Sequence, residues 1–200
     1  MSIRGVVFDY GGVLARPPVL DDFQPVADEM GLTWKIYRDG VSKYRLEYDS
    51  DLITCEDMYR RIMEDHGLAM SDEQCKRLCR ADDESWLHPI PETLAWMREL
   101  KSQGYRIGIL TNMATEFFDR CVRHVFAEHI ALADALVVSG KAGVSKPDAR
   151  IYALMESRMA LQSGEILFFD DNAVNVEGAR SCGWQAAVFT STKDAKGMLV

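Results

Sequence analysis

The sequence predicts an α/β fold, a Rossmann-like parallel sheet with an all-helical domain inserted after its first strand. An apolar run, Gly5-Val6-Val7-Phe8, is typical of a buried strand and stops abruptly at Asp9 and a glycine-rich turn. From Tyr105 onward, short apolar runs alternate with segments of helical periodicity, which is the βα pattern of a parallel sheet. Between these parts, residues 16–88 contain no β-branched run of strand type.

The first strand is expected over about Ile3 to Phe8, and helices follow it. Within 55–66 the apolar side chains recur at helical spacing, and Gly67 closes the segment. Ser71, with Gln74 three residues later, is a helix-start signal. We therefore predict a core domain formed by residues 1–15 and 89–200, and a helical cap domain over residues 16–88.

The second half of the chain is predicted to alternate helices and strands. Pro91 begins a helix with an apolar stripe that ends near Gly104. The strands expected after it are 105–110, 135–138, 166–169 and 185–189, and the helices are 114–125, 147–159 and 173–181.

Composition limits the class of protein and of partner. The chain has 200 residues, of which 48% are hydrophobic and 27% charged, enough for one core domain with a modest insertion. Its net charge of -8 argues against nucleic acid or an anionic membrane as a partner. No apolar stretch approaches the roughly 18 residues of a membrane span, and no signal-peptide core follows Met1. We expect a cytoplasmic protein with a small-molecule partner.

The five cysteines predict reduced thiols. They are odd in number and scattered, with no C-x-x-C pair, which argues against a disulfide framework. Cys75 and Cys79 are four residues apart, but no second Cys or His pair completes a zinc site with them. Buried packing is the favoured interpretation.

Polar residues follow the predicted strands at one edge of the sheet. Asp9 ends the first strand, and the run 166–169 ends on Asp170 and Asp171. Ligands of open α/β sheets bind in the crevice outside the carboxyl ends of the strands. A single Asp there often only caps a turn, but three carboxylates at one rim indicate a site.

Two further segments add donors to this edge. Thr111 and Asn112 follow a strand and offer a hydroxyl, an amide and backbone N–H groups at a helix start, where anions bind readily; the alternative is an N-cap pair. Lys146 precedes Pro147, which favours an extended lysine and begins the next helix. A solvated loop lysine is the ordinary alternative.

Electrostatics then favours a cation. Two carboxylates about 5 Å apart repel by roughly 3 kcal/mol at an effective dielectric constant near 20, and Lys146 alone does not neutralise three. Mg²⁺ prefers one or two carboxylates, waters and a substrate phosphate. The pattern therefore indicates phosphoryl transfer, with a carboxylate nucleophile that forms an aspartyl-phosphate.

The chain resembles the haloacid dehalogenase-like hydrolase superfamily. Its four ordered motifs are matched by Phe8-Asp9-Tyr10-Gly11-Gly12-Val13-Leu14, Leu110-Thr111-Asn112, Ser145-Lys146-Pro147 and Phe169-Asp170-Asp171-Asn172. The helical insert resembles the cap that this superfamily places between its first two motifs, where it covers the site and selects substrates. The paired Asp before Asn is most similar to sugar-phosphate phosphatases and to the phosphatase domain of soluble epoxide hydrolases.

This resemblance implies a role for each matched residue. Asp9 would be the nucleophile and a Mg²⁺ ligand, Thr111 would hold a phosphate oxygen with Asn112 assisting, and Lys146 would steady Asp9 and the phosphoryl group. The backbone carbonyl of Gly11 would be a further metal ligand. Alignment on Glu177-Gly178-Ala179 makes Asp171 the direct metal ligand and Asp170 its support.

Gly11 departs from the family pattern. Most phosphatases of the superfamily have at this position an Asp that protonates the leaving group and activates water. Such acid–base help is worth about 10² to 10⁴ in rate, or roughly 3 to 5 kcal/mol. A leaving group of low pKa needs less of it, and a cap residue or water would otherwise substitute. The candidates in or beside the insert are Asp21, Asp22, His66 and His88.

The leading hypothesis is a Mg²⁺-dependent phosphatase acting on a small cytosolic phosphate ester, such as a sugar phosphate. One alternative is a non-catalytic member that binds metal and phosphate, which Gly11 supports. Another is a 2-haloacid dehalogenase, since these enzymes also lack the second Asp; they need no metal, however, whereas this chain retains the acidic pair Asp170-Asp171. Both a monomer and a homodimer are compatible with the sequence.

Overall fold

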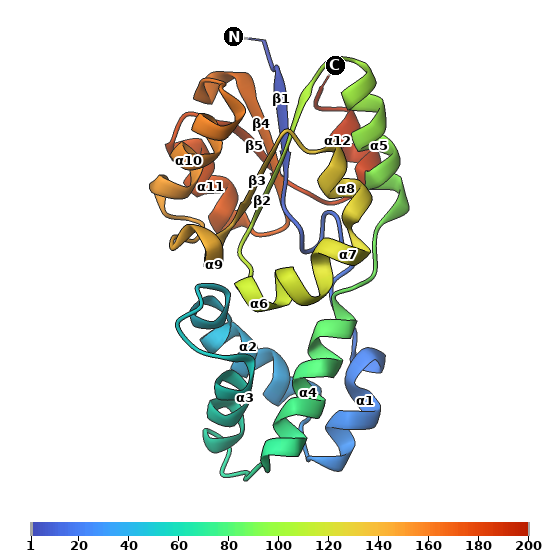
Figure 1. Ribbon diagram of the computed structural model, residues 1–200, viewed down its shortest axis with the longest axis vertical. Coiled ribbons are helices and arrows are strands. Elements are labelled where there is room, and N and C mark those ends of the chain that lie inside the picture. The colour runs from blue at the N-terminus through green and yellow to red at the C-terminus, as the bar shows by residue number, and fades with distance from the viewer. Residues whose placement is uncertain (1, 200) are drawn as a thin grey trace.

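The computed structural model describes residues 2–199 and confirms the predicted fold class. Five parallel strands form one sheet in the order β3-β2-β1-β4-β5 (Figure 1). Sequential strands thus lie on either side of the central β1, as in a doubly wound fold. The strands are β1 (Gly5–Phe8), β2 (Arg106–Thr111), β3 (Ala135–Val138), β4 (Ile166–Asp170) and β5 (Gln185–Val188).

Helices cover both faces of the sheet (Figure 1). Val6 and Phe8 of β1 pack with Trp96 on one face, while Val7 packs with Tyr152 on the other. Because both faces are buried, the interiors of β1, β2 and β4 are apolar, and Asp9, Thr111 and Asp170 come at or just after their carboxyl ends. One face carries α10 (Ala149–Met159) and α11 (Ala173–Ser181), and the other α5 (Pro91–Ser102), α8 (Ala127–Leu132) and α12 (Thr192–Lys196).

Four helices form a separate bundle at the carboxyl ends of the strands (Figure 1). Thr54 and Ser71 cap α3 and α4, each with a reciprocal side-chain bond from the third helical residue. The two segments that connect core and cap lie side by side, and Arg16 N of one donates to the His88 carbonyl of the other at 2.9 Å. The cap helices are α1 (Leu20–Glu29), α2 (Trp34–Asp49), α3 (Cys55–Glu64) and α4 (Asp72–Ser85).

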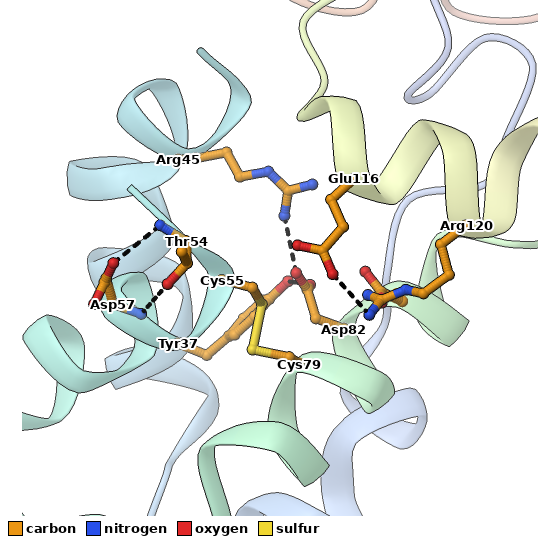
Figure 2. Close-up of a disulfide and its surroundings, with 10 residues drawn as sticks. Tyr37, Arg45, Thr54, Cys55, Asp57, Cys79, Asp82, Glu116 and Arg120 are labelled. Atoms are coloured by element: carbon orange, nitrogen blue, oxygen red, sulfur yellow. Dashed lines mark hydrogen bonds and ion pairs between the residues drawn. A yellow bond between two sulfur atoms is a disulfide. The ribbon is translucent and has the colours of Figure 1, made fainter. Parts of the chain in front are cut away.

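The expectation of reduced thiols is wrong for one pair of cysteines. Cys55 on α3 and Cys79 on α4 form a disulfide, with Cα atoms 5.9 Å apart (Figure 2). Packing of the two helices joins residues that are 24 positions apart, which the spacing of cysteines along the sequence does not reveal. Because the disulfide occupies the Cys79 sulfur, Cys79 and the free Cys75 make no zinc-ligand pair.

Some boundaries differ from the prediction. The predicted helix 114–125 is present to within one residue, but it consists of α6 (Thr115–Phe117), a π-helical turn (Phe118–Val122) and α7 (Arg123–Val125). Helix α10 starts at Ala149 with Asp148 as its N-cap, not at Pro147. Four short elements were not predicted: α8, α9 (Ser139–Ala142), α12 and the 3₁₀ turn Ser163–Glu165. Across residues 2–199, no helix has the length and apolar character needed to cross a bilayer.

Candidate active site

Strand register brings the predicted residues to one edge of the sheet. Phe8 pairs with Phe169, and Asp9 N donates to the Phe169 carbonyl at 2.9 Å, so Asp9 lies beside Asp170. A cavity of about 480 Å³ lies at this edge, between core and cap. Of the predicted site residues, its walls include Asp9, Gly11, Thr111, Asn112, Lys146 and Asp171, while Asp170 is fully buried behind them.

Lys146 is buried between two carboxylates. Its Nζ lies 2.8 Å from Asp9 Oδ1 and 2.6 Å from Asp170 Oδ2, and it donates to the Leu110 carbonyl at 3.1 Å. Burial alone would lower the pKa of Lys146, but Asp9 and Asp170 raise it above its ordinary value. The side chain is therefore a fixed cation that faces the nucleophile.

Asn112 holds this lysine in place through its backbone. Its Oδ1 accepts from Lys146 N at 2.8 Å and its Nδ2 donates to the Lys146 carbonyl at 3.0 Å. A phosphate-binding role for Asn112 stays a prediction, because one N–H of its amide is already used here. The first N–H of α6 is also occupied, since Thr115 N donates to Asp51 of the cap at 2.9 Å.

Thr111 ends β2 on the cavity wall. Its hydroxyl makes one long bond, to the Asn112 carbonyl at 3.3 Å. A hydroxyl can donate one hydrogen bond and accept two, so the contact leaves Thr111 able to rotate toward an anion.

Asp170 is saturated with hydrogen bonds. Its Oδ1 accepts from Asn172 N at 2.8 Å and from Asn175 Nδ2 at 3.1 Å. Its Oδ2 accepts from Lys146 Nζ at 2.6 Å and from Asn175 Nδ2 at 3.1 Å. A carboxylate offers about four lone-pair sites, and all are engaged. The neighbouring Asp171 is exposed, so it is the carboxylate of this pair that remains free to bind an ion.

The acidic cluster has the chemistry of a Mg²⁺ site. Asp9, Asp170 and Asp171 each place an oxygen within 4.8 Å of the others. Burial first, and then repulsion from Asp170, raises the pKa of Asp9 well above its usual range. Asp171 keeps exposed surface, but partial desolvation of its carboxyl by the surrounding protein, followed by repulsion from Asp170, raises its pKa as well. Closely spaced hard oxygen donors fit Mg²⁺. Asp9 and Asp171 would hold the ion, with the predicted Gly11 carbonyl beside them.

Trp86 fills the space next to Gly11. A Cβ placed on Gly11 would lie 3.1 Å from Trp86 Cζ3, which is a tight contact. Trp86 is fixed in turn by Tyr10, whose hydroxyl donates to the Trp86 carbonyl at 2.6 Å. The room that a side chain at position 11 would need is thus taken by the cap.

Arg45 and Asp49 of α2 add two charges to the cavity wall. Arg45 Nε donates to Asp49 Oδ1 at 3.0 Å, and Arg45 Nη1 donates to Asp82 at 3.1 Å (Figure 2). The guanidinium carbon lies 5.3 Å from the Trp86 ring centre. Sequence reasoning missed both residues because an i,i+4 charge pair is the usual pattern of an exposed helix face.

The acid–base candidates named from the sequence lie elsewhere. His66 and Asp21 are exposed, and Asp22 binds Arg16 at 3.1 Å with His88 Nε2 3.8 Å away. None of the four lines the cavity. Their position in or beside the insert did not predict which cap residues face the core.

A family model described as haloacid dehalogenase-like hydrolase matches residues 3–183. The chain belongs to this family. It is 27% identical to "Phosphatase MT3486" of Mycobacterium tuberculosis (strain CDC 1551 / Oshkosh), over 93% of this chain and 87% of the relative. It is 31% identical to an (S)-2-haloacid dehalogenase of Pseudomonas putida, over 92% of this chain and 82% of the relative.

Solved structures of haloacid dehalogenase-like proteins share the fold of this hydrolase. The family enzyme bt-2542 from Bacteroides thetaiotaomicron, in complex with magnesium and inorganic phosphate, superposes with a TM-score of 0.74 at 17% identity, over 100% of both chains. A dehalogenase superposes with a TM-score of 0.76 at 20% identity, over 99% of this chain and 97% of that one. The protein is therefore a hydrolase of a family that includes phosphatases and dehalogenases.

Proposed function

We propose that this hydrolase is a Mg²⁺-dependent phosphatase of small phosphate esters, with Asp9 as its nucleophile. The observation that carries the proposal is the cluster of Asp9, Asp170 and Asp171, with oxygens within 4.8 Å of one another. Carbon–halogen hydrolysis uses a carboxylate nucleophile without a metal. A divalent ion that also binds the substrate phosphate accounts for the close approach of Asp9 and Asp171, the two carboxylates of the cluster that are not saturated with hydrogen bonds.

The chain's own residues supply most of the proposed mechanism. An oxygen of Asp9 attacks phosphorus while the Thr111 hydroxyl holds a phosphoryl oxygen and the Lys146 cation stabilises the charge of Asp9 and of the phosphoryl group, and the ester bond on the far side breaks. Water then releases phosphate from the aspartyl-phosphate. When bound, Mg²⁺ supplies charge neutralisation for the phosphoryl oxygens. The cap limits access of bulk water to the reacting atoms.

The substrate is proposed to be a small molecule. A cavity of about 480 Å³ lies in the range of small-molecule sites, and a sugar phosphate stays the predicted type. The absence of a nucleic-acid or membrane partner, and a monomeric or homodimeric state, stay predictions. A cytoplasmic location also stays a prediction. The Cys55–Cys79 disulfide means that reduced cysteines no longer support it.

The first test is phosphate release from a panel of aryl and sugar phosphates, with Mg²⁺ or with EDTA. We expect Mg²⁺-dependent release that Asp9→Asn abolishes, because an amide does not form the acyl-phosphate. Asp28→Asn, an exposed carboxyl of the cap, is the matched control and should keep wild-type activity. An inert wild type across the whole panel would contradict the proposal and favour a member that only binds phosphate.

A 2-haloacid dehalogenase is the second candidate. The 31% identity with such an enzyme and the glycine at position 11 favour it. Halide release from an (S)-2-haloacid in EDTA, lost in Asp9→Asn, would establish it in place of the phosphatase.

A further inference from the structure

The charged groups on the cavity wall point to one residue with no assigned task. Five charged side chains of the described residues line the cavity: Asp9, Arg45, Asp49, Lys146 and Asp171. Asp9 is the proposed nucleophile, Asp171 a proposed metal ligand and Lys146 the fixed cation. Arg45 does not give up a proton in proteins. Asp49 is therefore the one remaining group of this set that is able to exchange a proton.

A chain of contacts runs from Gly11 through Trp86 and Arg45 to Asp49. Trp86 covers Gly11, with its Cζ3 3.1 Å from where a Cβ would lie. The Arg45 guanidinium lies 5.3 Å from the Trp86 ring centre, and Asp49 accepts from Arg45 Nε at 3.0 Å. These three cap residues line the same cavity as Gly11, and Asp49 supplies a carboxyl to that wall.

The carboxyl of Asp49 is anchored but not saturated. The backbone carbonyl of Asp49 accepts from Ser139 Oγ of the core at 2.6 Å, and this bond fixes the end of α2 against the core. Arg45 Nε binds Oδ1, and no donor within residues 2–199 binds Oδ2. The side chain keeps 9% of its surface, and it lines the cavity. One oxygen of Asp49 is therefore available to a substrate or a water.

The direction of the reaction places the leaving group near the cap. Asp9 approaches phosphorus from the core, and an in-line displacement expels the ester oxygen on the opposite side. That side is bounded by the cap residues of the cavity wall, which are Val41, Ser42, Arg45, Leu46, Asp49 and Trp86. Asp49 is the carboxyl in this group.

We propose that Asp49 is the general acid and base of the reaction, in place of the carboxyl that Gly11 lacks. The proposal rests on the phosphatase function proposed above. As Asp9 bonds to phosphorus and the P–O ester bond breaks, the protonated Asp49 gives its proton to the leaving oxygen, and an alcohol departs. The Asp49 carboxylate then takes a proton from water as that water attacks phosphorus. The bond to Asp9 breaks, orthophosphate leaves, and both carboxyls return to their starting state.

The electrostatic surroundings of Asp49 suit this cycle. The pKa of Asp49 is raised to about 6, mainly by burial and in part by Asp82 of α4, while Arg45 and Lys146 lower it in part. A catalytic group works best when its pKa lies near the working pH, because both protonation states are then accessible.

The test compares two aryl esters of similar size, 4-nitrophenyl phosphate and phenyl phosphate, in Mg²⁺. In Asp49→Asn we expect kcat/KM to fall by about 10² to 10⁴ for phenyl phosphate, whose more basic leaving group needs the proton. For 4-nitrophenyl phosphate, the first turnover should proceed at nearly the wild-type rate. It should be followed by slow turnover, giving a burst of one nitrophenol per enzyme and an accumulated aspartyl-phosphate.

Asp82→Asn is the matched control. It also removes a carboxylate from Arg45, but Asp82 does not line the cavity. It should therefore show the wild-type ratio between the two esters and no burst. Three outcomes would overturn the acid–base role. In Asp49→Asn these are an equal fall of kcat/KM for both esters, or no fall for either. The third is the same selective fall of kcat/KM and the same burst in Asp82→Asn.

These outcomes separate the two proposals. If wild type hydrolyses the esters and Asp9→Asn does not, the phosphatase function stands whatever Asp49→Asn does. If wild type and Asp9→Asn are equally inert, the phosphatase function fails, and the role of Asp49 fails with it.

Discussion

Single residues set the geometry of the acidic cluster, and Gly12 is the clearest case. Its φ of +70° lies in the left-handed region, and a Cβ there would lie 2.6 Å from Asp171 Oδ2. The glycine therefore serves two purposes. It allows the turn after Asp9, and it leaves room for the carboxylate that remains free to bind an ion.

Gly12→Ala should weaken metal binding. Backbone strain alone should cost about 1 to 2 kcal/mol of unfolding free energy, and displacement of Asp171 should raise the Mg²⁺ concentration for half-maximal phosphate release by roughly tenfold or more. Gly31→Ala is the control, because Gly31 has φ +67° with no heavy atom within 4 Å of the added Cβ. It should lose similar stability with no change in Mg²⁺ requirement. A Mg²⁺ titration of both variants decides, and an equal shift in the two would contradict a specific effect on Asp171.

Three of the residues that the sequence predicted for the site share one property. Asp9, Thr111 and Asp171 follow apolar runs, so their place at the strand ends depends on local pattern alone. Arg45 and Asp49 depend instead on which face of α2 the cap turns toward the core. No local pattern records that packing, because an i,i+4 charge pair is also the usual pattern of an exposed helix face.

At the scale of elements, the bounds of the core strands and helices were predictable to within about two residues. The strand 135–138 and the helix 173–181 have the predicted bounds because apolar periodicity changes abruptly there. The helix after β2 begins at Thr115, and its first N–H is bound by Asp51 of the cap, 64 residues away. Because Asp51 is so far from Thr115 along the chain, the residues around Asn112 give no indication of this contact.

The disulfide between α3 and α4 should stabilise the cap. Closing a loop between cysteines 24 residues apart contributes about 3 kcal/mol in the chain-entropy model. We expect a reductant to lower the free energy of unfolding of wild type by up to that amount in urea titrations followed by Trp fluorescence. A Cys55→Ala/Cys79→Ala variant should already be destabilised and should not respond further.

Cys75→Ala serves as the control for this prediction, because Cys75 is a buried free thiol on the same helix. It should retain the full response to the reductant. A wild type that unfolds identically with and without reductant would show that the pair does not stabilise the fold.

At the scale of the whole molecule, cap and core are joined by polar contacts around the cavity. Ser50 and Ser145 share a hydrogen bond of 2.8 Å, and Arg120 of the core pairs with Asp83 of α4. Burial raises the pKa of Asp83 to about 7, although Arg120 lowers it in part. The interface thus holds carboxyls that resist ionisation, and its strength depends on pH.

The buried titratable groups act on stability in opposite directions as pH changes. Asp49 and Asp83 have folded pKa values of about 6 and about 7, above the ordinary 3.8, so the folded state binds their protons more tightly. Their contribution to the free energy of unfolding is complete below pH 3.8 and is lost as pH rises through 6 to 7. His129 behaves oppositely, because both of its buried ring nitrogens lack partners within residues 2–199 and burial lowers its pKa to about 4. Its effect is to lower the free energy of unfolding of the protein as pH falls from 6.5 toward 4.

The carboxyls should outweigh the histidine. Between pH 7.5 and pH 5, Asp49 and Asp83 together gain about 4 kcal/mol and His129 loses about 2 kcal/mol. Asp9 and Asp171, whose pKa values are also raised, act in the same direction, so in EDTA the protein should be at least about 2 kcal/mol more stable at pH 5 than at pH 7.5 by urea unfolding. His129→Leu removes the opposing group and should raise this difference by about 2 kcal/mol, whereas Asp83→Asn should lower it by about 2 kcal/mol. Greater stability at pH 7.5 than at pH 5 in wild type would mean that these carboxyls are ionised in the folded protein.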